Sequence, residues 1–191
     1  MNLGLARKDS GMKKLDLQLF GEAISGKRIV YLFRVLEQAA SKTGATIAYT
    51  TENSRTKSKD ADSTATKSGS IRTPGVSEVE LSATCYMSKD DTLVDELEKA
   101  MDEDKIIEIW EAYLDRPIAS QTNKFEGKYY QGYLTEIELS SSSDDFAEYS
   151  LSFGVNGGGV PAPASGITVT EEQQKEADYV FSDTTKAVGA M

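Results

Sequence analysis

The residues whose spacing best resembles a ligand-binding motif lie in the segment DADSTATKSGSI, residues 60–71. Oxygen-bearing side chains take positions 1, 3, 5 and 7 of a calcium-loop register, and these are Asp60, Asp62, Thr64 and Thr66. A calcium loop also needs a glycine at position 6 and a bidentate glutamate at position 12, where this segment has Ala65 and Ile71. No helix pattern flanks the segment, so the sequence does not predict a calcium site.

The side chains most used in catalysis are nearly absent. The chain has no histidine and one cysteine, Cys85, which excludes histidine-dependent triads and an internal disulfide framework. Cys85 falls at an inward position of a predicted strand, where cysteine behaves as a small buried hydrophobe. The glycine-rich segment GVNGGG (154–159) does not open a helix pattern, so it cannot act as a dinucleotide-binding turn. We therefore expect no catalytic residues, no cofactor and no metal.

Acidic pairs and aromatic side chains offer the remaining chemistry. Glycoside hydrolysis needs two carboxylates facing each other across a cleft. Each acidic pair here falls at a predicted turn or helix start instead, where it caps the helix or faces solvent: Asp90/Asp91, Asp144/Asp145 and Glu171/Glu172. Five aromatic residues could stack sugars or bases, but at strand spacing they are typical of core and cross-strand pairs: Tyr129, Tyr130, Tyr133, Tyr149 and Phe153. The sequence thus predicts a protein that contacts other proteins and is not an enzyme.

Composition limits the possible partners. The chain has 191 residues, of which 39% are apolar, and a net charge of −10. This length fits one domain plus extended ends, and the acidic excess disfavours tight binding to nucleic acid or anionic membranes. No stretch reaches the roughly 18 apolar residues of a membrane span. The segment MKKLDLQLF (12–20) lacks a small-residue cleavage site, so we predict no signal peptide and a cytoplasmic site of synthesis.

Apolar periodicity predicts the elements that must position these residues. Strands are expected at 28–36, 45–54, 76–87, 105–114, 127–140 and 146–157. A short helix from residue 33 is an alternative for the end of the first strand. One helix is expected at 89–103, with Ser88 as N-cap and Asp91 completing a capping box, and a second capping box from Thr170 to Gln173 predicts a short helix or an arm. The fold class is therefore α+β and mainly antiparallel, with the last two strands paired through the turn at 140–145.

Alternation within the strands predicts which side chains face inward. We expect one buried face in each of three strands: Val79, Leu81, Ala83, Cys85 and Met87; Tyr129, Gln131, Tyr133, Thr135, Ile137 and Leu139; and Ala147, Tyr149, Leu151, Phe153 and Val155. In the strand 45–54 the expected inward residues are Ile47, Tyr49 and Thr51. The strand 105–114 is apolar on both faces, so we expect it to be covered on both sides for part of its length.

The connection between the second and third strands, residues 54–75, is too polar to bury itself. Its one strongly apolar residue is Ile71, and five residues are basic: Arg55, Lys57, Lys59, Lys67 and Arg72. Two acidic residues reduce its net charge to +3, which leaves −13 on the rest of the chain. Loops of this length are usually functional or disordered. A flexible hairpin tip and a nucleic-acid-binding arm are alternatives, but a positive arm on a negative body also fits docking onto another copy of the chain.

Two segments of the chain, STATKSGSI and LSFGVNGGG, are the most distinctive parts of a pattern that extends from about Gly26 to Thr185. In this pattern the sequence resembles the major tail protein family of phages with long, flexible, non-contractile tails. It implies a β-sandwich or barrel-like core with one flanking helix. The corresponding division of the chain is an N-terminal extension at 1–25, a core at 26–157 and a C-terminal linker and arm at 158–191.

The resemblance also implies a function. Six copies would join sheet edges into a ring, and rings would stack into a tube around a tape-measure protein, with tail terminator and baseplate or distal tail proteins as further partners. The tube would conduct DNA without binding it, and the connection 54–75 would reach a neighbouring ring. The protein would belong to the virion after assembly in the host cytoplasm. Candidate lumen-facing acids are Glu78, Glu80, Glu136, Glu138 and Glu148. A soluble carbohydrate- or surface-binding β-sandwich, with Tyr129 or Tyr133 exposed, is the alternative.

Overall fold

The computed structural model describes residues 23–177 of the chain. Its strands are β1 (Ile29–Val35), β2 (Thr50–Thr66), β3 (Gly69–Tyr86), β4 (Ile107–Pro117), β5 (Lys124–Ser140), β6 (Glu148–Val155), β7 (Val160–Pro161) and β8 (Ile167–Thr168). Its helices are α1 (Leu93–Asp102) and α2 (Glu171–Ala177), with short 3-10 turns at Gly26–Arg28 and Leu36–Gln38. None of the helices in this range is long and apolar enough to cross a membrane.

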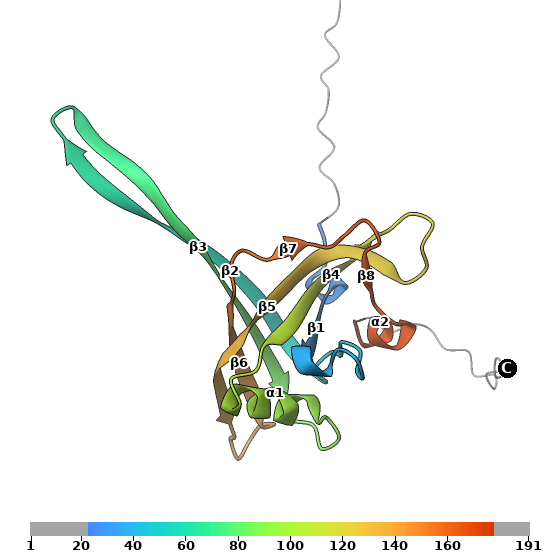
Figure 1. The fold of residues 1–191 in the computed structure, drawn as a ribbon. Coiled ribbons are helices and arrows are strands. Elements are labelled where there is room, and N and C mark those ends of the chain that lie inside the picture. The colour runs from blue at the N-terminus through green and yellow to red at the C-terminus, as the bar shows by residue number, and fades with distance from the viewer. Residues whose placement is uncertain (1–22, 178–191) are drawn as a thin grey trace, which may run out of the picture.

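All eight strands belong to one antiparallel sheet with the order β1-β4-β5-β6-β3-β2, and β7 and β8 pair with the beginning of β5. The sheet curls until Phe33 of β1 stacks on Phe153 of β6, with ring centroids 5.2 Å apart. The end strands β1 and β2 do not pair, so the barrel-like sheet stays open. Helix α1 covers one end of it (Figure 1). This arrangement confirms the predicted α+β class, mainly antiparallel, with one flanking helix.

Two apolar cores lie on opposite faces of β4. The larger core fills the inside of the curled sheet and includes Ile107 and Ile109, which are fully buried. The smaller core lies behind β1, β4 and the start of β5, and includes Ala112 and Leu114. The expectation that this strand is covered on both faces is therefore confirmed.

The second core corrects the predicted linker. Ile167 and Val169 are buried in it, and β7 and β8 bond to β5. Residues 160–169 are therefore part of the packed domain, not the start of an arm. Sequence patterns could not reveal this, because each of the two strands is only two residues long, too short to show a periodicity. Residues 178–191 of the predicted arm and 1–22 of the predicted extension lie outside the described range.

Four strand predictions are confirmed and two need correction. The segments 28–36, 76–87 and 146–157 contain β1, the second half of β3 and β6, and most of 105–114 lies in β4. In 45–54, Tyr49 has φ 52°, so the chain turns there and the strand begins only at Thr50. In 127–140 the buried residues of the first half are Tyr130 and Leu134, opposite to the predicted face. The register shift after Leu134 is a bulge that exchanges the faces, which alternation alone could not reveal.

Helix α1 begins later than predicted. It starts at Leu93 with Thr92 as N-cap, and no side chain caps it at that residue. The Asp91 carboxylate accepts bonds from the backbone N–H groups of Leu93 and Ala48, both at 2.8 Å. Asp91 thus ties the helix start to the turn before β2, and residues 89–92 become a connection rather than a first helical turn.

The predicted loop at 54–75 is a two-stranded ribbon. Strands β2 and β3 pair from Thr50 to the tip, where Lys67 and Ser68 form a two-residue turn between Thr66 and Gly69. Gly69 has φ 135°, which favours glycine at this turn. Paired strands satisfy each other's backbone groups, so the segment needs no core, and its threonines suit extended backbone. The absence of apolar residues therefore indicated lack of burial, and not lack of structure.

Candidate assembly surfaces

The described residues contain no constellation suited to catalysis or metal binding. No group of three or more His, Cys, Asp or Glu side chains between residues 23 and 177 could hold a metal ion. Cys85 is buried, and burial raises the pKa of its thiol to about 11, so it is an inert thiol. Asp60 and Asp62 lie along the extended β2, where oxygen ligands cannot converge on one cation. The candidate surfaces for contact with other proteins are an exposed face of the sheet, its edges and the ribbon.

The first such surface is the outer face of the four-stranded part of the sheet, formed by β2, β3, β6 and the second half of β5. The strand register aligns its side chains in rows across the strands. Two rows contain only acidic and hydroxyl side chains: Glu52, Thr84, Ser150 and Glu138; and Ser54, Ser82, Ser152 and Glu136. A third row contains Thr56, Glu80, Gly154 and Tyr133. These rows contain no lysine or arginine, so the face is negative.

The predicted lumen acids all lie on this outer face. The register places Glu78 opposite Ser58, Glu80 opposite Thr56 and Glu148 opposite Tyr86. Glu136 and Glu138 are exposed on the adjoining part of β5. Glu52 also lies on this face, opposite Thr84, and was not among the predicted acids although the predicted alternation places it outward. Before the bulge in β5, the even-numbered residues face the core. After the bulge they face outward, which places Glu136 and Glu138 on the outer face.

The same four-stranded part has two edges that lack a partner strand within residues 23–177. β2 is the last strand of the sheet. β5 pairs with β4 only as far as Gly132, whereas its pairing with β6 continues to Ser140, so residues 134–140 have one partner strand only. The opposite end of the sheet, β1, is partly closed by two backbone bonds between Phe33 and Ala45, of 2.8 and 3.0 Å. Free backbone donors and acceptors on a sheet edge are a template for another strand.

The second surface is the ribbon, which projects from the body on one side (Figure 1). None of the side chains from Ser54 to Glu78 in the ribbon is buried. Among the five predicted contact residues, Arg55 is engaged within the chain, since its Nε lies 3.1 Å from Oε2 of Glu111. No ion pair forms in the described range at the other four, and all four are exposed: Lys57, Lys59, Lys67 and Arg72.

A buried polar cluster fixes the base of the ribbon. Glu111 is 3% exposed and accepts hydrogen bonds from the hydroxyls of Tyr113 at 2.8 Å and Tyr130 at 2.9 Å, besides its ion pair with Arg55. Burial raises the pKa of Tyr113 to about 12, aided by the bond to Glu111. Burial also raises the pKa of Tyr31 and Tyr130, so these phenols stay neutral.

The ion pair of this cluster links two distant strands. Burial lowers the pKa of Arg55, but the charge of Glu111 and the neighbouring tyrosines together outweigh that effect and raise it overall. Arg55 stands on β2 and Glu111 on β4, so the pair joins the last strand of the sheet to the second strand from its opposite end. No sequence motif predicted this cluster, because Arg55 lies among the other basic residues of a segment that was expected to be exposed to solvent.

A second buried carboxylate, Glu108, lies on the opposite face of β4 from Glu111. Glu108 is 6% exposed and pairs with Arg34, whose Nη2 lies 2.6 Å from Oε2. Its other oxygen accepts a hydrogen bond from Tyr129 at 2.6 Å, and the Tyr129 ring packs against Trp110 at 5.5 Å. Tyr129 is therefore engaged inside the domain, and not displayed for stacking on a ligand.

Comparisons with known proteins identify what this arrangement is similar to. A family model described as phage tail tube protein matches residues 23–160. A protein named as a tail protein of Staphylococcus phage phiMR25 is 33% identical over 165 residues, which cover 85% of this chain and 83% of that protein.

Two solved structures share the fold. The SPP1 tail tube superposes with a TM-score of 0.64 at 19% identity, over 87% of this chain and 95% of that chain. The tail of an empty gene transfer agent particle, solved with C6 symmetry, has a TM-score of 0.58 at 16% identity, over 74% of this chain and 100% of that chain.

Proposed function

The chain belongs to the phage tail tube protein family, and from this we propose that six copies form a ring and that stacked rings build the tube of a long, non-contractile tail. The observation that carries the proposal is the pair of free antiparallel edges on the four-stranded part of the sheet. In this role the protein is structural and works without catalysis. The sixfold order is supported by the C6 symmetry of the gene transfer agent tail that shares the fold.

The edges are complementary in direction. Neighbouring strands from β2 through β3 and β6 to β5 are all antiparallel, so β2 and β5 run in opposite directions. When a copy is rotated about a ring axis, its β2 therefore lies antiparallel to residues 134–140 of its neighbour's β5. Backbone bonds between these edges extend the sheet from copy to copy, and a contact of this head-to-tail kind closes when the rotation completes a circle.

The outer face then lines the lumen. Its rows of serine, threonine and glutamate give DNA no basic side chain to bind, and the acids repel the phosphates. Glu78, Glu80, Glu136, Glu138 and Glu148 are the proposed lumen acids, joined by Glu52. A tape-measure protein occupies the lumen before DNA passes, and terminator and baseplate proteins cap the two ends. The tube is part of the virion and assembles in the host cytoplasm.

Electron microscopy of the purified chain tests the assembly. At high protein concentration we expect rings or hollow tubes, and a sedimentable fraction that grows with concentration. A monomer at every concentration and salt condition would contradict the proposal.

Charge reversal tests the lumen. In the double variant Glu136→Lys and Glu138→Lys we expect tubes that retain added DNA at low salt and release it at high salt. The matched control reverses two exposed acids away from the outer face, Glu126 and Glu171. Equal DNA retention by the two variants would mean that the outer face does not line the lumen.

A further inference from the structure

Exposed apolar side chains gather at one end of the four-stranded part of the sheet. Ten large apolar side chains are exposed in the described range. Five of them stand where β2 and β6 begin and where β3 and β5 end, and we call these the apolar rim: Tyr49, Tyr86, Met87, Leu139 and Phe146. Such a concentration on a monomer marks a contact surface.

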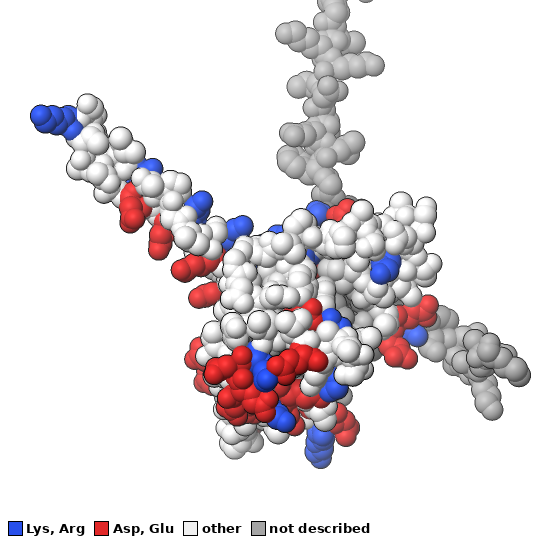
Figure 2. Space-filling view, viewed as in Figure 1, with Lys and Arg blue, Asp and Glu red and all other residues white. Residues whose placement is uncertain are grey.

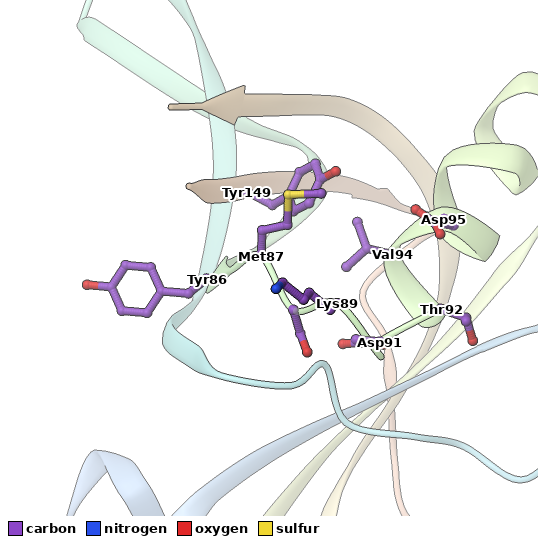
Figure 3. Close-up of a pocket in the computed structure, with 9 residues that line it drawn as sticks. Tyr86, Met87, Lys89, Asp91, Thr92, Val94, Asp95 and Tyr149 are labelled. Carbon is purple, nitrogen blue, oxygen red and sulfur yellow. The ribbon is translucent and has the colours of Figure 1, made fainter. Parts of the chain in front are cut away.

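The rim is an ordered surface. The backbone N–H of Tyr86 bonds to the carbonyl of Tyr49 at 3.2 Å, and that of Met87 to Ala147 at 2.8 Å. The rings of Tyr86 and Phe146 pack 5.7 Å apart. Beside them lies a pocket of about 160 Å³, on which the side chains of Met87, Val94 and Tyr149 converge while the Tyr86 ring points away (Figure 3). This pocket offers space for an aliphatic side chain.

Acidic side chains surround the rim. The start of α1 and the turn between β5 and β6 supply them: Asp90, Asp91, Asp95, Asp144, Asp145 and Glu148, against one lysine, Lys89. In Figure 2, red side chains with blue ones among them gather on the body below the ribbon, at the place of α1 in Figure 1. A partner for the rim should therefore be both apolar and cationic.

The distal part of the ribbon, residues 59–77, has this character. Its exposed apolar side chains are Ile71, with 60% exposed, and Val76, with 83% exposed. Its charged residues are Lys59, Lys67 and Arg72 against Asp60 and Asp62, which gives a net charge of +1. Neither apolar side chain has a buried neighbour in the ribbon, so both remain in water in the single chain.

We propose that the apolar rim is the docking site for the ribbon of a second copy in the adjacent ring. Strand β3 runs from the ribbon tip at Gly69 to the rim at Tyr86, so the two surfaces lie at opposite ends of one strand and cannot meet within a chain. A contact that joins one end of a copy to the opposite end of the next copy can be repeated along an axis without closing into a ring. Stacked copies have this geometry. Residues 69–79 extend about 36 Å at ~3.3 Å per residue, whereas the eight residues of β6 extend about 26 Å. The ribbon is therefore long enough to cross the rim of a neighbour. The inference rests on the proposed function and adds the receiving surface.

Single apolar substitutions on each side test the docking. We expect Val76→Ser and Phe146→Ser each to reduce the sedimentable tube fraction about tenfold, because each removes one aliphatic or aromatic side chain from the interface. Both residues are exposed in the monomer, so its urea unfolding should not change. Val160→Ser is the matched control, because Val160 is also exposed but lies on β7, away from both surfaces.

Cysteine pairing identifies the partner surface directly. Cys85 is buried, so engineered thiols are the accessible ones. When Val76→Cys and Met87→Cys chains are mixed, assembled and oxidised, we expect a disulfide between the two variants; a mixture of Val160→Cys with Met87→Cys should give none. If the wild type forms tubes but the serine variants do so equally and the cysteines fail to pair, the docking site is wrong and the proposed function stands. If the wild type forms no rings or tubes, the proposed function itself fails.

Discussion

The two halves of strand β3 differ in the interactions that stabilise them. From Val79 to Cys85 every second residue is buried in the main core. From Gly69 to Glu78 no residue is buried, and only pairing with β2 maintains the strand. One continuous strand thus belongs to a packed domain at one end and to a solvent-exposed ribbon at the other.

This contrast separates folding from assembly. A lone two-stranded hairpin is marginally stable in water, so the ribbon gains little by itself and depends on the body at its base and, in the proposed stack, on a partner at its tip. Exposed residues there are free to serve contacts between copies, whereas the residues after Val79 are constrained by packing. Destabilising changes should therefore concentrate in the body and assembly defects in the ribbon.

The largest effect on stability is expected from the body core. Phe153 is 1% exposed and stacks on Phe33, so Phe153→Ala should lower the free energy of unfolding by about 4 kcal/mol. Ile71→Ala in the ribbon should change it by less than about 0.5 kcal/mol. Urea titration followed by circular dichroism measures both. Similar losses in the two variants would mean that the ribbon is packed in solution, and the contrast would disappear.

A smaller effect is expected where the two regions join. Glu111→Ala leaves Arg55 without its partner and removes the acceptor of the Tyr113 and Tyr130 hydroxyls. We expect a loss of about 3 kcal/mol in the free energy of unfolding. The control is Glu126→Ala, since Glu126 forms only an exposed pair with Arg116 at 3.7 Å, which contributes less than about 1 kcal/mol. Should the two variants lose equal amounts, backbone pairing alone would hold the base of the ribbon.

The body could be predicted from the sequence further than the ribbon could. Alternation at Val79–Cys85 and Leu151–Phe153 identified buried strands correctly, because one face of each meets the core. Alternation failed at Tyr130, because the bulge after Leu134 exchanges the two faces of β5. Polarity misled at 54–75, since pairing between two polar strands leaves no apolar pattern.

The assembly surfaces were only partly predictable. Glu78, Glu80, Glu136, Glu138 and Glu148 were recognised as wet-face acids, and the register gathers them on one face. The Arg55–Glu111 pair joins residues 56 positions apart on strands that are not neighbours in the sheet. The apolar rim likewise combines four chain segments. Such groupings depend on the curl of the sheet, which local patterns do not specify.

Alkaline pH should weaken the polar cluster around Glu111 at the base of the ribbon. The folded-state pKa of Tyr113 is raised to about 12 from an ordinary value of about 10. Its neutral form is therefore favoured by folding, and this contribution is complete below pH 10 and lost as the pH rises to about 12. Tyr113 is half-buried, so solvent screening limits the effect to less than about 1 kcal/mol. The urea midpoint should fall over this range less steeply in Tyr113→Phe than in the wild type. The control is Tyr49→Phe, on an exposed ring outside the cluster, and a wild-type slope in Tyr113→Phe would contradict the prediction.

The smallest change in stability is expected from removing most of the ribbon. Lys59 and Ser77 face each other across the two strands, so replacing residues 60–76 by Asn-Gly closes the hairpin with a favourable two-residue turn. The excised residues bury no side chain, and we expect the free energy of unfolding to stay within about 0.5 kcal/mol of the wild type. Tube formation should nevertheless be lost, because Ile71, Arg72 and Val76 are gone while both sheet edges of the body remain. Rings that do not stack are the expected product in electron microscopy. Normal tubes from this variant would assign stacking to the body, and a large loss of stability would show that the ribbon supports the fold itself.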